Sequence, residues 1–173
     1  MTRILVFGDS IAWGAWDLNG GWIQKLRTYL EKKLLSTPEF WKEEFYQVYN
    51  LGVASTIGEN SQTLLKRFKH EANARFEKDE RTIFVFAIGK NDSRFLKSKN
   101  NFAVPKEDFR KNIVKLIKNA KEFSPEIIFI GTTPINDSKT SPIPWDRDAS
   151  YKNEYLQEYN AILKEVCLKE KIP

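Results

Sequence analysis

Four short hydrophobic runs alternate with four longer amphipathic stretches along the chain. The runs are rich in apolar and β-branched residues, which is typical of parallel strands in a buried sheet; they cover residues 3–7, 45–51, 82–88 and 127–131. Between and after them, apolar residues recur at helical spacings; these stretches cover residues 22–34, 64–76, 105–123 and 155–166. Strict alternation of strand and helix predicts an α/β fold, with a doubly wound parallel sheet in three layers.

The segments between these elements show no linker, repeat or low-complexity tract, so we expect one domain over residues 1–173. Residues 93–104 and 132–148 are polar and are predicted to be irregular. A crossover helix in such a sheet leads back to a strand. Because the last predicted helix has no strand after it, we expect a fifth strand to be missing and the chain to be truncated at its C-terminus.

Charge and cysteine content bound the function classes. The net charge of +5 is spread over predicted helix faces, which favours solvated surfaces over nucleic-acid binding. One cysteine, Cys167, allows no disulfide within the chain. No apolar run is long enough to span a membrane, and a strand predicted from residue 3 leaves no room for a signal peptide. We therefore expect a cytoplasmic protein.

Small and polar residues follow each predicted strand. Ligands of doubly wound sheets bind at the carboxyl ends of the strands, so these residues are predicted to form one site. They are Gly8-Asp9-Ser10 after the first strand, Gly52 after the second, Gly89-Lys90-Asn91-Asp92 after the third and Thr132-Thr133-Pro134 after the fourth.

The chemistry that fits these residue types is acyl transfer, which needs a nucleophile and donors for the developing oxyanion. Ser10 can supply the hydroxyl and one backbone N–H. Gly52 can supply a second N–H, and Asn91 a side-chain N–H. Asp9 is predicted to shape the turn through bonds to backbone, and Asp92 to support it in the same way.

Aromatic residues on the predicted rim loops can form an apolar substrate pocket or pack beneath those loops. The candidate lining residues are Trp13, Phe95, Thr133 and Trp145. For Lys90, a solvated side chain and a preference for an anionic substrate are both open.

Three blocks of this sequence resemble the GDSL/SGNH hydrolase family; they are Gly8-Asp9-Ser10-Ile11, Asn50-Leu51-Gly52 and Gly89-Lys90-Asn91-Asp92. The resemblance implies a flavodoxin-like fold and a serine hydrolase that acts on small-molecule esters without metal or cofactor, as a lipase, esterase, acylhydrolase or carbohydrate deacetylase. It also implies that Ser10 is the nucleophile and that Gly52 and Asn91 stabilise the oxyanion.

The fourth block of that family, Asp-x-x-His, is absent from these residues. The only histidine, His70, falls on the polar face of a predicted helix, opposite Phe68. A serine without a base is a weak nucleophile. Either the chain is cut short, or it is a non-hydrolytic relative, or a partner supplies the base. We expect the chain as given to have little or no activity.

A second function class stays open, because flavodoxin-like sheets also bind flavins and nucleotides at this rim. The first loop, Gly8 to Gly14, lacks Gly-x-Gly-x-x-Gly and a Gly-Lys-Ser/Thr phosphate loop. It also lacks the Asp-x-Asp of metal-dependent phosphatases. A non-catalytic binding module or an inactive scaffold is therefore the alternative, and a homodimer is also left open.

Overall fold

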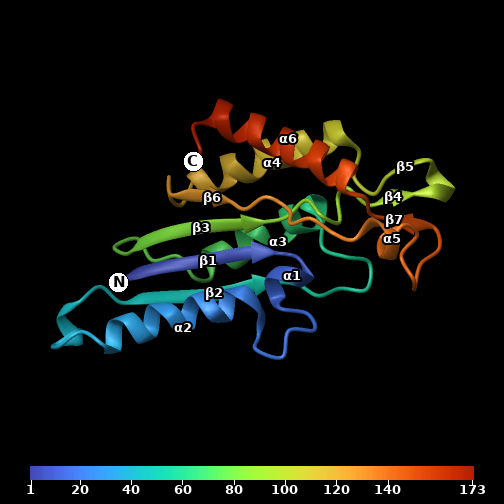
Figure 1. The fold of residues 1–173 in the computed structure, drawn as a ribbon. Helices are drawn as coiled ribbons and strands as arrows, with labels where there is room; N and C mark the ends of the chain where they lie inside the picture. The colour runs from blue at the N-terminus through green and yellow to red at the C-terminus, as the bar shows by residue number, and fades with distance from the viewer.

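The computed structural model describes residues 1–173 and is built on a four-stranded parallel sheet (Figure 1). Its order is β2-β1-β3-β6, with the strands β1 (Thr2–Gly8), β2 (Tyr46–Gly52), β3 (Arg81–Ala87) and β6 (Ile127–Phe129). Gly8 lies opposite both Gly52 and Ala87, so the carboxyl ends of three strands meet at one edge. The predicted parallel sheet is confirmed.

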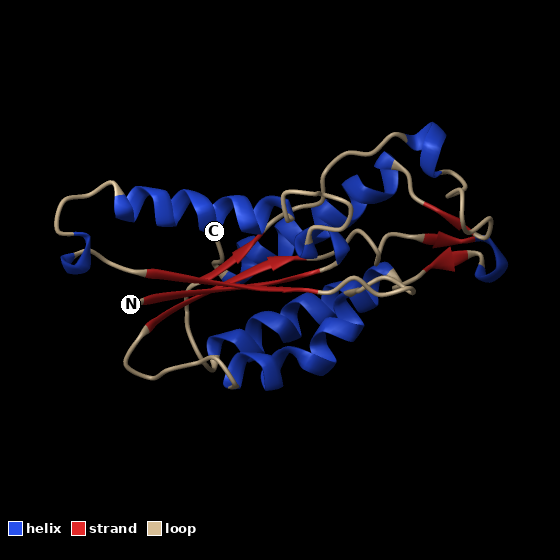
Figure 2. Ribbon diagram, turned by 90° about the horizontal axis from the view of Figure 1, so that it is seen from below, coloured by secondary structure: helices blue, strands red, loops and turns tan.

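Helices cover both faces of this sheet (Figure 2). The four long ones are α2 (Gly21–Leu35), α3 (Ser61–Asn73), α4 (Lys106–Lys121) and α6 (Asn153–Glu170). The larger core lies between the sheet and α3, α4 and α6, where the rings of Phe7 and Phe68 have centroids 5.0 Å apart. The smaller core, which includes Val6, Ile23 and Val85, lies on the α2 face. Three layers follow, as the alternating pattern predicts.

A second, antiparallel sheet was not expected from the sequence. Its order is β5-β4-β7, with strands of two residues each: β4 (Phe95–Leu96), β5 (Asn101–Phe102) and β7 (Ala149–Ser150). Two 3₁₀ turns and a short helix complete the connections: Phe40–Lys42, Lys97–Lys99 and α5 (Asp137–Thr140). The prediction that residues 93–104 and 132–148 are irregular is therefore wrong in part, because both segments contain regular structure that frames the carboxyl edge of the main sheet.

None of the helices combines the length and the apolar character needed to cross a bilayer.

Candidate active site

Ser10 is the first residue of the short helix α1 (Ser10–Trp13), directly past the end of β1. The Asp9 carboxylate caps this helix by accepting a hydrogen bond from the Ile11 N–H at 2.9 Å, the kind of bond expected for Asp9 from the sequence. Gly8 allows the tight turn, because a Cβ there would lie 2.5 Å from the Cβ of Ala12. A cap and a close helix–strand contact thus hold the Ser10 backbone.

The Asn91 side chain is buried and fixed from two sides. Its Nδ2 donates to the Glu59 carbonyl at 2.8 Å, and its Oδ1 accepts from the Tyr151 hydroxyl at 2.6 Å. Glu59 is itself held by Arg67, whose guanidinium also donates to the Leu51 carbonyl at 2.8 Å. One hydrogen of Nδ2 goes to Glu59, so the amide has a second donor in a fixed orientation.

A cleft of about 500 Å³ brings these groups together. We call it the serine cleft. Its lining includes Ser10, Gly58, Asn91, Arg94 and Tyr151. No hydrogen bond joins the Ser10 hydroxyl to another side chain, whereas Asp9 and Asn91 are both engaged.

Two of the four predicted lining residues are tryptophans, and both lie at the serine cleft. Trp13 and Trp145 both line it, together with Trp16. The rings of Trp16 and Trp145 meet edge to face with centroids 6.2 Å apart, and their side chains are largely exposed. They join the loop after α1 to the loop before β7 and give one wall of the cleft an aromatic surface.

Phe95 does not line the cleft, and this prediction is corrected. Its ring packs against Phe102 and Tyr155, with centroids 5.7 and 5.9 Å away, because the pairing of β4 with β5 turns it toward α6. The fourth predicted residue, Thr133, lines a neighbouring pocket.

Gly52 is also absent from the serine cleft. Its N–H donates to the Asn50 side chain at 3.0 Å, and a Cβ at Gly52 would lie 2.3 Å from the backbone nitrogen of Trp13. The glycine is thus required for the packing of β2 against α1, and its N–H is already used. The prediction that Gly52 faces the site is therefore corrected, since Gly58 is the glycine that lines the cleft.

Gly58 is the glycine that lies against Asn91. A Cβ there would lie 2.7 Å from Asn91 Cγ, and its φ of +76° is one that other residues rarely adopt. The Gly58 N–H closes a turn on the Ser55 carbonyl at 3.1 Å. The sequence signal that could have identified Gly58 is its position two residues before Asn60, the residue that caps α3.

Replacing Gly58 with alanine should displace Asn91 and lower stability. Gly20→Ala is a matched control, because Gly20 has nearly the same φ (+78°) but a Cβ there would meet only the flexible Gln24 side chain. We expect Gly58→Ala to reduce the free energy of unfolding by about 1–3 kcal/mol more than Gly20→Ala. Urea unfolding measures both. Equal losses of unfolding free energy in the two variants would show that Asn91 can move to make room for a Cβ at position 58.

Asp92 supports the site from behind and does not line the cleft. Its fully buried carboxylate accepts from the Ser61 N–H at 3.0 Å and from the Ser61 hydroxyl at 2.5 Å, which fastens the start of α3 to the end of β3. Burial raises the pKa of Asp92 to about 6.

This pKa makes stability depend on pH. The folded chain holds the Asp92 proton more tightly than the unfolded chain, whose pKa is near the ordinary 3.8. Its contribution is therefore fully present below about pH 4 and is lost as the pH rises through about 6, by about 3 kcal/mol. In urea unfolding at pH 4 and pH 7, the wild type should lose about this much more stability than Asp92→Asn. The exposed Asp79→Asn controls for the change in charge and should follow the wild type.

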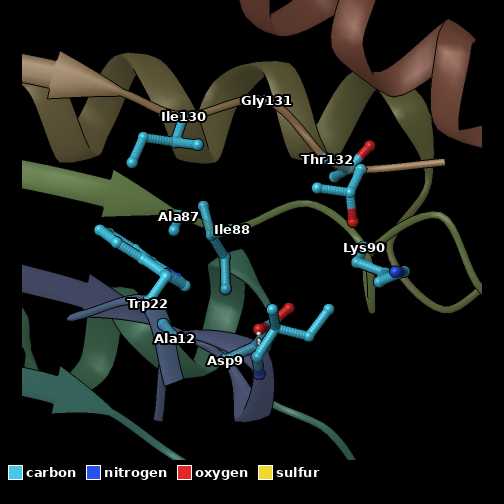
Figure 3. Close-up of a pocket in the computed structure, with 11 residues that line it drawn as sticks. Asp9, Ala12, Trp22, Ala87, Ile88, Lys90, Ile130, Gly131 and Thr132 are labelled. Atoms are coloured by element: carbon cyan, nitrogen blue, oxygen red, sulfur yellow. Dashed lines mark hydrogen bonds between the residues drawn. The ribbon is translucent and has the colours of Figure 1, made fainter. Parts of the chain in front are cut away.

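A second, more apolar pocket of about 310 Å³ adjoins the cleft (Figure 3). Trp22, Ile88 and Ile130 give it apolar walls, and Thr133 also lines it. Asp9, Ile11 and Lys90 line both hollows, so the two are neighbours along the carboxyl edge of the sheet. Figure 3 shows the Lys90 side chain extending away from Asp9 and Ile88.

No histidine takes part in either hollow. His70 is exposed in the last turn of α3, outside the lining of both. No group of three or more His, Cys, Asp or Glu side chains gathers in a way that could hold a metal ion.

Comparison with known proteins decides the family. A family model described as GDSL-like lipase/acylhydrolase matches residues 4–171. The chain belongs to the GDSL-like lipase/acylhydrolase family. The sequence of this GDSL-like protein finds no match among curated proteins.

Three solved structures share the fold of this GDSL-like chain. TesA is 17% identical, with a TM-score of 0.66 over 98% of this chain and 75% of TesA. AlinE4, an SGNH-hydrolase family esterase, is 18% identical, with a TM-score of 0.65 over 98% of this chain and 72% of its own. Axe2, an acetylxylan esterase from Geobacillus stearothermophilus, is 18% identical, with a TM-score of 0.64 over 98% and 73%.

Proposed function

We propose that this GDSL-like protein transfers the acyl group of a carboxylic ester to Ser10 and releases it to water. The observation that carries the proposal is the convergence of Ser10 and Asn91 on one cleft at the carboxyl edge of the sheet. Family membership supports ester hydrolysis as the reaction class.

In the first step the Ser10 Oγ gives its proton to a base and attacks the ester carbonyl, and the C–O bond breaks so that the alcohol leaves with a proton. In the second step water attacks the acyl-enzyme, the bond to Ser10 Oγ breaks, the carboxylic acid leaves and the Ser10 hydroxyl is restored. Each tetrahedral intermediate carries an oxyanion that needs preorganised donors. We assign this role to the second N–H of Asn91 Nδ2 and to the Ser10 backbone N–H, because both belong to the same cleft and are held rigidly. The glycine at the cleft wall is Gly58 and not Gly52. Because Gly58 has no Cβ, the wall can approach Asn91 closely.

Proton transfer from Ser10 needs a base, and no histidine lies within the serine cleft. The proposal therefore predicts slow turnover by residues 1–173 alone and a higher rate when a diffusible base is added. Imidazole is the appropriate base, since it supplies the group that serine hydrolases use most often. Ester hydrolysis with added imidazole, compared between the wild type and Ser10→Ala, tests the proposal.

A binding module without catalysis is the alternative. The serine cleft and the apolar pocket together could hold a ligand without turnover. The two functions differ in one measurement, because only the hydrolase forms a covalent acyl group on Ser10.

A further inference from the structure

Two cations in the serine cleft form no salt bridge, although the Asp9 carboxylate lies close enough to Lys90 to attract its charge. Lys90 and Arg94 both line the cleft, and neither forms an ion pair within the chain. Other half-buried arginines do form one: Arg3 pairs with Glu80 and Arg67 with Glu59. The Arg94 Nε is fully buried and has no hydrogen-bond partner at all.

The fold places Arg94 in the cleft and keeps it there. Phe95 of β4 pairs with Ser150 of β7, so the residues next to them, Arg94 and Tyr151, lie opposite each other. The Arg94 carbonyl accepts from the Ala103 N–H at 2.7 Å, which fixes the backbone that carries the guanidinium. The backbone that carries Arg94 is therefore fixed, and its side chain lines the same cleft as Ser10 and Asn91.

The only carboxylate that lines the cleft is Asp9, and it is already used as the cap of α1. Burial raises the pKa of Asp9 and lowers the pKa of Lys90, and the attraction between the two groups offsets this only in part, so both charges remain poorly solvated. An unpaired cation in a partly buried site costs free energy, which an anionic ligand would offset.

We propose that Lys90 and Arg94 form an anion subsite in the serine cleft, and that it holds the carboxylate or phosphate group of an acidic ester substrate. That the bound anion belongs to a substrate rests on the proposed hydrolase function. The subsite itself is a binding site that exists without turnover. A guanidinium binds both kinds of oxyanion in a bidentate manner, and an ammonium adds a point charge. The Trp16–Trp145 wall provides an apolar surface for the rest of the ester.

Anion binding is measured first, because it needs no catalysis. Inorganic phosphate and succinate are titrated separately at constant ionic strength, with chloride as the balancing anion, and tryptophan fluorescence reports binding at the cleft. The wild type should bind at least one of them, and the tighter one identifies the phosphate or the carboxylate as the preferred group. Lys90→Met and Arg94→Met should each weaken binding about tenfold.

Lys118→Met is the matched control. Lys118 is an exposed lysine on α4, outside the cleft lining, so this substitution removes the same charge without changing the cleft. It should bind as the wild type does. Arg94→Lys keeps the charge but loses the bidentate fork, so its affinity should fall between those of the wild type and Arg94→Met. Circular dichroism of each variant verifies the fold.

Three results would overturn the subsite: no binding of either anion, equal weakening by Lys118→Met, or wild-type affinity in both cleft variants. Failure of the hydrolase function looks different, because Ser10→Ala would leave hydrolysis unchanged while phosphate or succinate binding persists. With imidazole present, the ratio of kcat/KM for mono-4-nitrophenyl succinate over 4-nitrophenyl butyrate should also fall about tenfold in Arg94→Met.

Discussion

Replacing Ser10 with alanine is expected to reduce the hydrolysis of p-nitrophenyl acetate by this protein, measured in imidazole buffer, to the rate of imidazole alone. The wild type should exceed that rate, because imidazole can diffuse into an open cleft of about 500 Å³ and accept the Ser10 proton. Without the hydroxyl there is no nucleophile for the protein to orient, so the whole protein-dependent rate should vanish.

A second serine of the same cleft makes the comparison specific. Ser55 also lines the cleft but is exposed on the loop after β2. Ser55→Ala should retain the wild-type rate with imidazole. Intact-mass measurement after brief incubation with ester should show one added acetyl group in the wild type and in Ser55→Ala, and none in Ser10→Ala. If hydrolysis and acylation persist in Ser10→Ala, the nucleophile is another residue.

The main sheet and its helices could be predicted because each is specified by a local pattern. β3 (Arg81–Ala87) is continuous in apolar residues over most of its length, and its buried centre, Phe84 to Phe86, allows no other reading. The strands β4, β5 and β7 have two residues each, which is too short for any period to show. Their pairing comes from tertiary contacts, such as the bond from the Lys97 N–H to the Asp148 carbonyl.

The residues of the candidate site could be predicted only where they lie just after the end of a strand. Ser10 lies two residues after the end of β1 and Asn91 four residues after the end of β3, and the topology brings them to one edge. The choice between Gly52 and Gly58 depends on the hydrogen bond that the Gly52 N–H donates to the Asn50 side chain, which no spacing rule reveals. Tyr151 enters the site from a segment 60 residues away from Asn91 along the chain, through a pairing that the sequence does not show.

Replacing Asn91 with alanine is the second large effect that we expect. It removes the side-chain donor assigned to the oxyanion, and one such donor contributes about 10² in kcat. The loss should appear in kcat of the imidazole-assisted reaction with little change in KM, because the oxyanion exists only after attack. Asn73→Ala, at an exposed position in α3, is the matched control and should leave the rate unchanged.

Stability must be separated from catalysis in this variant. Asn91→Ala also leaves the Glu59 carbonyl and the Tyr151 hydroxyl without their partner, which should cost about 1–3 kcal/mol for a buried group. Tyr151→Phe breaks only the bond to Oδ1 and keeps the Nδ2 donor, so its kcat should stay well above that of Asn91→Ala. A kcat for Asn91→Ala within about twofold of the wild type would remove Asn91 from the oxyanion hole, since even a weak donor there contributes more.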